Sequence, residues 1–507
     1  MKARFILALA LTAGLSGCRT PAATPPPTPA PTEGVPGPTL FESDWRDPSP
    51  FLVGLVNSQA EALAALPAAT VYHLDLNLSD DLTVVDGIGE ILYTNTEAAP
   101  LDQIALHLYP NLLGGEIAVK SARLNGELVT PNYGEGEGWM SVPLGSALAP
   151  GQSVVLRLEF SVRVPQELEL NYGVLASTSG VLAYAHGYPM IAVYDDEGWN
   201  VGIPPTYGDL TYADAALFLV RVRAPDRLVV CASGSEIERS DADGRQIVTY
   251  AIGPARDFYL AASGEYEVLT QQAGPTTVRT CAPADMQTAA RRVLDVAARA
   301  LELFSRIYTP YHYTELDVVA TPNLALGIEY PGAFALNQRL LTPEEDFKSA
   351  PESVLLESVV AHETAHEWFY NLVGNDQLDD PWLDEALAQY AMFEYYAATY
   401  GDSGAQGTLS SFYDRWDRVD RQTIAIGMPV GAYDEGSYAP IIYGRGPLFF
   451  DALHNALGQE AFDTFLRDYT AAFTWKVATP EGLKQLAEQH CGCDLTPLFQ
   501  EWVYGQP

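Results

Sequence analysis

The stretch from residue 361 to residue 390, AHETAHEWFYNLVGNDQLDDPWLDEALAQY, decides how the second half of this 507-residue chain folds. His362 and His366 are four residues apart in a window of helix-forming residues, 353–372, so a helix points both imidazoles to one side, where they can share a metal ion. Glu363 is offset by one position, which places its carboxylate beside that metal without making it a ligand. Activation of a water molecule requires this arrangement. The alternative is a chance grouping on a solvated helix.

A catalytic zinc site needs a third protein ligand and one open coordination position. Glu385 follows His366 by nineteen residues in a second segment of helical pattern, 381–399, and the turn-like residues 374–376 lie between the two segments. Two helices joined by a short connection run antiparallel and face each other. We therefore predict one zinc ion held by His362, His366 and Glu385, because this ligand set suits zinc chemically.

The pattern of apolar residues changes near residue 270. Between about 70 and 268, short apolar runs alternate with a period of two, as in residues 72–78 (YHLDLNL), and Gly and Pro separate them. From about residue 283 longer helical stretches follow, interrupted by one strand-like piece at 316–320. We predict an α+β multidomain fold, with an antiparallel β domain at 46–270 and a helix-rich domain at 271–507.

With these features the chain, from about residue 70 to its end, resembles the gluzincin aminopeptidases, the group of aminopeptidase N and leukotriene hydrolase. The resemblance implies a saddle-like β domain followed by a thermolysin-like catalytic domain. It also implies that His362, His366 and Glu385 bind one zinc ion and that Glu363 is the general base. Glu363 would take a proton from the attacking water and return it to the leaving amine.

Residues 327–332, GIEYPG, resemble the exopeptidase motif of this family, Gly-x-Met-Glu-Asn, with Ile328 and Tyr330 in place of the usual Met and Asn. By this resemblance Gly327 and Glu329 belong to the substrate-binding site. Glu329 would bind the free α-amino group of the substrate through a charge-assisted hydrogen bond. Without the resemblance, the same stretch reads as a loop rich in Gly and Pro.

Residues 443–446, YGRG, resemble the family's Tyr-x-Lys-Gly motif. By this resemblance Tyr443 stabilises the developing oxyanion, since a phenol donates a hydrogen bond without carrying a charge of its own. Arg445 stands where the family usually has Lys. Residues 208–209 and 256–258 also resemble family segments and support the fold, but the sequence assigns them no catalytic role.

The amino terminus predicts export. Lys2 and Arg4 precede an apolar run that is too short to span a bilayer, and residues 15–18, LSGC, resemble the lipobox of bacterial lipoproteins. We expect residues 1–17 to be a signal peptide, Cys18 to be lipidated, and the Pro-rich residues 18–45 to form a tether. The lipid would be the only membrane attachment, at the periplasmic or extracellular face. The alternative is an ordinary secretory signal with a chance cysteine.

The net charge limits the partners that the protein can bind, and the positions of the cysteines limit the disulfides that it can form. The formal net charge is −37, which argues against nucleic acid as a partner and favours cationic ligands, including peptides with a free amino terminus. Of the possible disulfides we favour Cys231 with Cys281, because Cys491 and Cys493 are too close in sequence for a relaxed bridge except with each other. A Cys-Gly-Cys zinc or redox site at 491–493 is the alternative.

These features together predict a zinc metallopeptidase, specifically an aminopeptidase acting on peptides with a free amino terminus. A thermolysin-type endopeptidase or an epoxide hydrolase could use the same metal site. Blocking the amino terminus of a test peptide separates an aminopeptidase from an endopeptidase. The alternative outside enzymes is a surface binding protein whose fold has lost catalysis.

Overall fold

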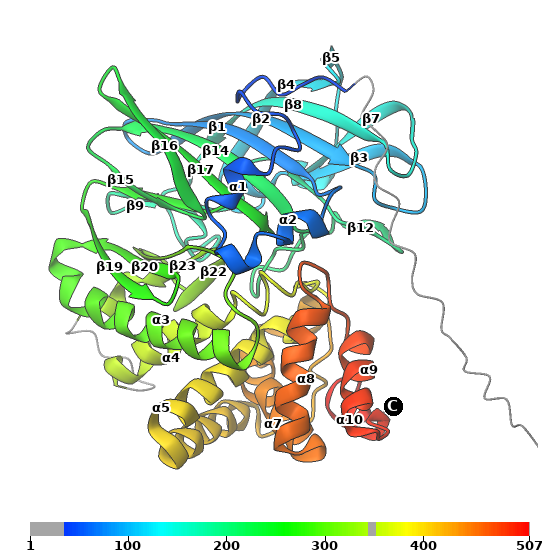
Figure 1. The fold of residues 1–507 in the computed structure, drawn as a ribbon, viewed down its shortest axis with the longest axis vertical. Helices are drawn as coiled ribbons and strands as arrows, with labels where there is room; N and C mark the ends of the chain where they lie inside the picture. The colour runs from blue at the N-terminus through cyan, green and yellow to red at the C-terminus, as the bar shows by residue number, and fades with distance from the viewer. Residues whose placement is uncertain (1–34, 343–350, 506–507) are drawn as a thin grey trace, which may run out of the picture.

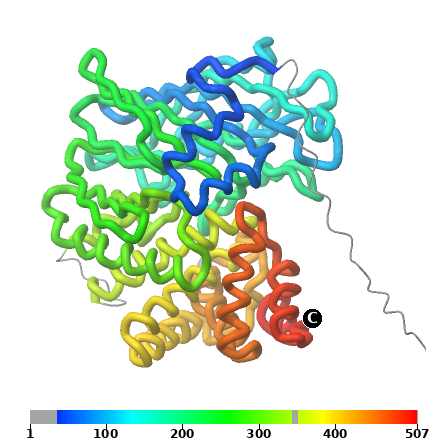
Figure 2. The backbone as a smooth tube through the Cα atoms, in the orientation of Figure 1, coloured from blue at the N-terminus to red at the C-terminus, as the bar shows by residue number. Residues whose placement is uncertain are grey.

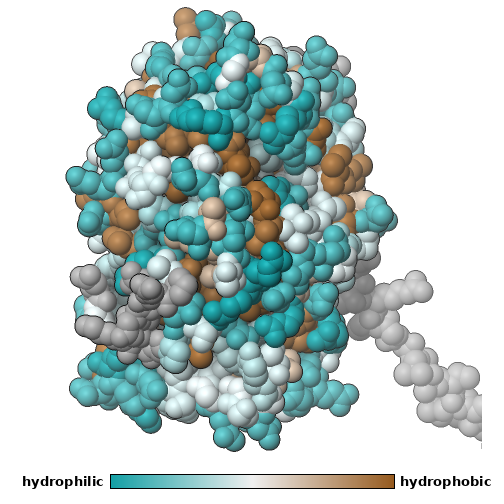
Figure 3. All heavy atoms as spheres, turned by 90° about the vertical axis from the view of Figure 1, so that its left-hand side faces the viewer, coloured by the Kyte–Doolittle hydropathy of each residue, from teal (hydrophilic) through white to brown (hydrophobic). Residues whose placement is uncertain are grey.

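The computed structural model describes residues 35–342 and 351–505, and Figure 1 shows a β-rich domain packed on a helix-rich domain. The predicted α+β order of domains is confirmed. The predicted signal peptide, Cys18 and the first part of the predicted tether lie outside the described residues. Among the described helices, none has the length and apolar character needed to cross a membrane. On the face shown in Figure 3, hydrophobic residues form small separate groups among hydrophilic ones.

The largest sheet of the β domain has eight strands in the order β16-β17-β14-β1-β2-β8-β4-β5. Its neighbours pair antiparallel except β1 and β14, which run parallel. Alternate β1 residues, such as Leu74, Leu76 and Leu78, belong to the main core. The strands are β1 (Val71–Leu78), β2 (Val84–Thr94), β4 (Glu116–Leu124), β5 (Glu127–Leu128), β8 (Ser153–Arg163), β14 (Ala216–Pro225), β16 (Ser235–Ala242) and β17 (Arg245–Ala255).

Three smaller sheets complete this domain, in the orders β15-β18-β10-β9, β11-β3-β7-β6 and β12-β13. Their strands are β3 (Leu101–His107), β6 (Asn132–Tyr133), β7 (Trp139–Leu148), β9 (Leu175–Thr178), β10 (Val181–Tyr184), β11 (Met190–Ile191), β12 (Tyr194–Asp195), β13 (Gly198–Trp199), β15 (Val229–Ala232) and β18 (Leu260–Ser263). The connection from β13 to β14 reaches the second domain, where the Tyr207 hydroxyl donates to the Tyr433 carbonyl at 2.6 Å. This connection therefore brings β-domain residues to the domain junction.

Residues 35–45, which the sequence analysis assigned to the tether, pack on the β domain. Figure 2 shows this segment as the start of the blue tube, lying along the domain. The Thr39 amide donates to Glu90 at 2.8 Å, and the Trp45 ring stacks on His73 at a centroid distance of 4.5 Å. Phe41 and Trp45 pack on this domain together with residues of the short helices α1 (Ser49–Leu52) and α2 (Ala62–Ala65). The predicted tether is therefore too long at its carboxyl end, because it includes apolar residues that cover a sheet.

The second domain begins with a five-stranded sheet in the order β19-β20-β21-β23-β22. Its strands are β19 (Tyr266–Ala273), β20 (Thr276–Pro283), β21 (Glu315–Thr321), β22 (Gly327–Tyr330) and β23 (Ala333–Asn337). The predicted boundary between residues 270 and 271 falls inside β19. Because β19 pairs with β20, the division between the sheets lies before Tyr266. The sequence pattern indicated only one of these strands, the one now seen as β21.

Helices form the rest of the second domain (Figure 1). They are α3 (Gln287–Ile307), α4 (Glu352–Ala365), α5 (Trp382–Trp416), α6 (Glu435–Pro440), the π-helical turn η8 (Ile441–Arg445), α7 (Gly446–Leu457), α8 (Gln459–Ala472), α9 (Pro480–Cys491) and α10 (Thr496–Trp502). Helix α4 ends at Ala365, earlier than the predicted residue 372, because the chain turns at His366. The two helices of the predicted metal site, α4 and α5, pack against each other.

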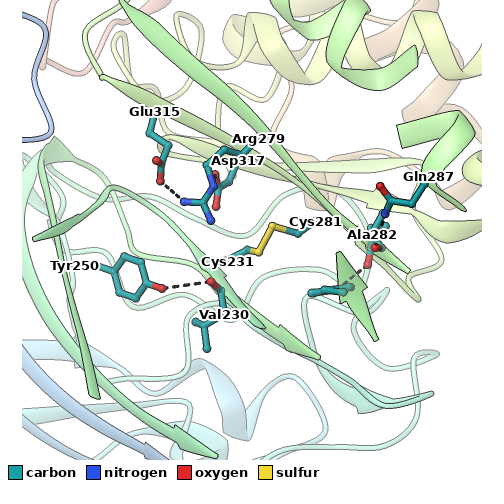
Figure 4. The surroundings of a disulfide bond; sticks show 11 residues. Val230, Cys231, Tyr250, Arg279, Cys281, Ala282, Gln287, Glu315 and Asp317 are labelled. Atoms are coloured by element: carbon teal, nitrogen blue, oxygen red, sulfur yellow. Dashed lines mark hydrogen bonds and ion pairs between the residues drawn. A yellow bond between two sulfur atoms is a disulfide. The ribbon is translucent and has the colours of Figure 1, made fainter. Parts of the chain in front are cut away.

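A disulfide links the two domains. Cys231 on β15 bonds to Cys281 on β20, as the sequence favoured, and Figure 4 shows the bridge between the two sheets. Both cysteines are fully buried in a small core that the two domains share. In the same core the Tyr259 and Tyr330 rings stack at 4.0 Å. The second disulfide joins Cys491 and Cys493, so these two sulfur atoms are bonded to each other and do not form the alternative zinc site.

We expect the paired change Cys231→Ala and Cys281→Ala to lower the free energy of unfolding by up to roughly 4 kcal/mol, since the bridge closes a loop with a sequence separation of 50 residues. Urea denaturation of the oxidised proteins measures the change. The control is Cys491→Ala with Cys493→Ala, which opens a loop with a separation of only 2 residues. Equal losses in the two double variants would contradict the prediction.

Candidate active site

Helix α4 and the start of α5 bring together the three residues predicted to bind metal. The Nε2 atoms of His362 and His366 lie 3.1 Å apart. The Oε2 atom of Glu385 lies 3.1 Å from the His362 Nε2 and 3.5 Å from the His366 Nε2. All three side chains are buried. The three potential ligand atoms therefore surround one point inside the protein.

These separations fit a tetrahedral zinc site. With ligand bonds of about 2.0–2.1 Å, tetrahedral geometry puts neighbouring ligand atoms roughly 3.3 Å apart. The Glu385 Oε2 is buried and makes no hydrogen bond within the described part of the chain, so a cation at the shared point would give it a partner. Two imidazoles and a carboxylate are also the donor types that zinc prefers.

Neighbouring groups fix the orientation of these side chains. The His366 Nδ1 lies 2.9 Å from the Phe369 carbonyl, which can only accept, so Nδ1 carries the proton and Nε2 keeps its lone pair. The Tyr443 hydroxyl donates to the Oε1 of Glu385. Although burial raises the pKa of Glu385, the neighbouring imidazoles of His362 and His366 bring that pKa well below its usual range. Glu385 therefore remains a carboxylate suited to binding a cation.

Strand β22 passes directly over Glu363. A Cβ atom placed on Gly327 would lie 2.2 Å from the Glu363 Oε1, far inside van der Waals contact. The other carboxylate oxygen of Glu363, Oε2, is buried and has no hydrogen-bond partner among the described residues. Gly327 thus leaves the space that this carboxylate occupies, beside the three potential ligands.

We expect Gly327→Ala to lower kcat by about 10²-fold with unchanged metal content, because the new methyl group displaces the Glu363 carboxylate by about 1 Å or more. Steady-state kinetics and metal analysis of the purified variant measure both effects. Gly407→Ala is the control, since a Cβ at Gly407 on α5 meets nothing within 4 Å. A Gly327→Ala enzyme with the wild-type kcat would show that this close approach has no functional consequence.

Acidic side chains from both domains gather next to the potential metal ligands. The Oε1 of Glu329, on β22, accepts from the Gln377 amide at 3.1 Å, and Gln377 also donates to Asp384 at 2.7 Å. Asp209 comes from the β13–β14 connection. Burial and the nearby carboxylates of Glu329 and Glu385 raise the pKa of Asp209 well above its usual range. The site thus gathers several carboxyl groups in one place.

Two of these residues were missed as functional candidates by the sequence analysis. Asp209 was noted only as a fold resemblance, and Gln377 was not singled out. Both lie in connections that carry no periodic pattern. The signal for Asp209 was its place in a Gly-Asp pair within a Pro-rich segment, 203–209, which is typical of an ordered loop.

Tyr443 lies on the π-helical turn η8, between α6 and α7. Its ring centroid is 6.1 Å from that of His362, so the phenol stands next to the potential metal ligands. Arg445, which replaces the lysine of the resembled motif, is buried and donates to the carbonyls of Ile424, Trp502 and Glu501. The Arg445 side chain therefore ties η8 to α10.

A cavity of about 680 Å³ opens at the domain junction and contains the site. Residues of the β domain form one wall, among them Leu170, Tyr172 and Ile203. Helices α4 and α5 and the turn η8 form the opposite wall, which includes His362, Glu363, Glu385 and Tyr443. A volume of this size is typical of a site for a small organic ligand.

The fold and the buried His, His, Glu site together define a metallopeptidase-like protein. Residues 292–502 match the profile of the Peptidase family M1 domain. This match covers most of the helix-rich part of the chain and agrees with the predicted resemblance.

Similar proteins agree with this family. Leucyl aminopeptidase of Saccharolobus solfataricus is 23% identical over 308 residues, which are 57% of this chain and 38% of that protein. Aminopeptidase M1-B of Oryza sativa subsp. japonica is 26% identical over 303 residues, which are 57% of this chain and 34% of that protein. The chain thus matches little more than a third of the length of these curated relatives.

The fold also matches solved structures. The crystal structure of the M1 zinc metallopeptidase from Deinococcus radiodurans superposes with a TM-score of 0.63 at 22% sequence identity, covering 87% of this chain and 95% of that one. A mutant of that protein, bound to a Tyr-Ser-Ala substrate, gives a TM-score of 0.64 at 22% identity, covering 86% and 93%. The match establishes the shared two-domain fold.

Proposed function

We propose that this protein is a zinc-dependent aminopeptidase that removes amino-terminal residues from peptides. The observation that carries the proposal is the meeting of three metal-binding atoms, 3.1–3.5 Å apart, beside the Glu363 carboxylate in a cavity that also holds Glu329 and Asp209. The names of the similar proteins, leucyl aminopeptidase and aminopeptidase M1-B, support the same activity.

In the proposed mechanism, His362, His366 and Glu385 would hold a zinc ion, which would supply Lewis acidity toward the attacking water and the scissile carbonyl. Glu363 takes a proton from the water and delivers it to the nitrogen of the leaving amine. The Tyr443 hydroxyl turns from Glu385 to donate a hydrogen bond to the oxyanion. Gly327 keeps Glu363 in its position by leaving room for the carboxylate.

The acidic end of the cavity supports a preference for a free amino terminus. Glu329 and Asp209 both line the cavity, and neither has a lysine or arginine partner among the described residues. A primary ammonium group has three N–H donors and one positive charge, so it can bind to both carboxylates at once. Gln377 holds the Glu329 carboxylate in place at 3.1 Å.

A pair of matched peptides tests the proposal. We expect the full-length zinc-loaded protein to cleave a dipeptide p-nitroanilide at least about tenfold faster than its amino-acetylated twin, because acetylation removes the charge that Glu329 and Asp209 bind. Glu329→Gln should reduce this ratio, whereas Glu357→Gln, at a partly buried residue outside the cavity, should not. Chromatography of the products measures both rates.

The outcomes separate the remaining candidates. Equal cleavage of both peptides would keep the metal chemistry and identify an endopeptidase. Hydrolysis of an epoxide with no peptide cleavage would identify an epoxide hydrolase. If neither substrate class reacts with protein that contains zinc, a surface binding protein becomes the better explanation.

We also propose that the protein is exported and attached to the cell envelope through a lipid on Cys18. The support is the sequence alone: a basic start, an apolar run and the LSGC stretch ending at Cys18. Cys18→Ser should abolish incorporation of a labelled fatty acid and release the protein from membranes. Labelling that persists in this variant would contradict the proposal.

A further inference from the structure

The cavity has a basic end as well as an acidic one. Arg415 and Arg418 are the only arginine or lysine side chains among its lining residues, as far as the chain is described. They stand at the carboxyl end of α5 and in the turn that follows, three residues apart, which places them on one side of the chain. In a protein with 65 acidic and 28 basic residues, two arginines without an acidic partner are unexpected.

Arg415 is held firmly but only by part of its guanidinium group. Its Nη1 donates to the Gln389 side chain at 2.9 Å and to the Tyr443 carbonyl at 3.1 Å. In the described regions, the Nε and Nη2 groups of this half-buried side chain donate to no protein atom, and neither of them is completely buried. A guanidinium fixed at one nitrogen, with its other donors free, is prepared to bind a carboxylate.

Arg418 is exposed and forms no ion pair with a described residue. By contrast, Arg421, one turn further, is bound to Asp417, with an Nη2 to Oδ2 distance of 3.0 Å. Arg418 therefore adds positive charge at the cavity without being neutralised by the protein.

The basic and acidic ends lie on opposite sides of the potential metal ligands along α5. Gln377, which holds Glu329, precedes α5 and contacts Asp384 at its start. Gln389, which holds Arg415, lies one helical turn after Glu385, about 6 Å along the axis. A peptide with its ammonium group at Glu329 and its scissile bond at the metal site therefore extends toward Arg415.

We propose that Arg415, assisted by Arg418, binds the free α-carboxylate of short peptides, so that the enzyme prefers peptides of two or three residues. This inference rests on the proposed aminopeptidase activity. Two to three residues span roughly 7–11 Å when extended, which suits a cavity of about 680 Å³. In a longer peptide the carboxylate lies too far from the metal site to reach Arg415.

The test compares a tripeptide with its carboxyl-terminal amide, using the full-length zinc-loaded enzyme. We expect kcat/KM to be about tenfold or more higher for the free acid, with the difference mainly in KM, as lost charged hydrogen bonds predict. Arg415→Gln should bring this ratio close to one, Arg415→Lys should retain part of it, and Arg418→Gln should reduce it. Arg421→Gln is the matched control and should keep the wild-type ratio.

A wild-type enzyme that cleaves acid and amide equally would overturn the inference, as would an unchanged ratio in both Arg415→Gln and Arg418→Gln. Because Arg418 is exposed, we expect Arg418→Gln to fold, so this variant tests the inference even if Arg415→Gln does not fold. The amide substrate still has a free amino terminus. Cleavage of the amide without any acid preference therefore refutes only the carboxylate site, whereas no cleavage of either peptide refutes the aminopeptidase proposal.

Discussion

Glu363→Gln is expected to lower kcat by about 10²–10⁴-fold and to leave one zinc ion per chain. Glutamine has nearly the same shape as glutamate, but it cannot accept a proton from water at neutral pH. The Glu363 carboxylate is buried beside Gly327, and one of its oxygens has no hydrogen-bond partner in the described protein. Steady-state kinetics and metal analysis on the same preparation measure the two quantities.

The control for this variant lies on the same helix. Glu357 on α4 pairs with Arg299 at 3.5 Å and accepts from Tyr395, away from the cavity. Glu357→Gln should therefore retain the wild-type kcat. If Glu363→Gln stays active while Glu357→Gln behaves as wild type, Glu363 is not the base. If Glu363→Gln loses its zinc, the carboxylate has a role in metal binding instead.

Local sequence periodicity was sufficient to predict the positions of the potential metal ligands. A spacing of four residues on a helix leaves little freedom, and the structure brings the His362 and His366 Nε2 atoms to 3.1 Å. The start of the second helix was also predicted to within one residue, at Trp382. In both helices, the pattern of apolar residues along the sequence agrees with the burial of the helix in the structure.

Strand β22 could not be identified from periodicity. Residues 327–330 read as a loop because they begin with Gly327 and are followed by Pro331 and Gly332. They form an edge strand only because β23, a few residues later, pairs with them antiparallel. Glycine is needed at 327 because the side chain of Glu363, which belongs to a different element, lies where a Cβ atom would be. Pairing and close approach of this kind depend on tertiary structure.

The acidic and basic ends of the cavity were beyond sequence reasoning for a related reason. Asp209 reaches the site from the other domain, and Arg415 lies thirty residues after Glu385 on a long helix. Each is one charged residue among many, and no spacing distinguishes it. What distinguishes Arg415 is the set of contacts with Gln389 and Tyr443, which appears only when α5 and η8 are packed.

Removing the metal or one of its ligands is expected to abolish activity. Glu385→Gln replaces the carboxylate by a weaker, neutral donor, so the purified variant should retain little zinc and show less than about 1% of the wild-type kcat/KM. Chelation of the wild type should have the same effect and should be reversed by added zinc. Asp402→Asn, an exposed change on the same helix, should keep both zinc and activity.

Thermal unfolding gives a second measure that does not depend on any substrate. If zinc binds the folded wild type at a free concentration one hundred times its Kd, it adds about 2.7 kcal/mol to the free energy of unfolding. Zinc should therefore raise the wild-type Tm and leave that of Glu385→Gln nearly unchanged. A similar rise in both proteins would place the stabilising ion elsewhere. A rise in the Tm of the wild type alone would show that the ion binds where the Glu385 Oε2 faces two imidazoles at 3.1 and 3.5 Å.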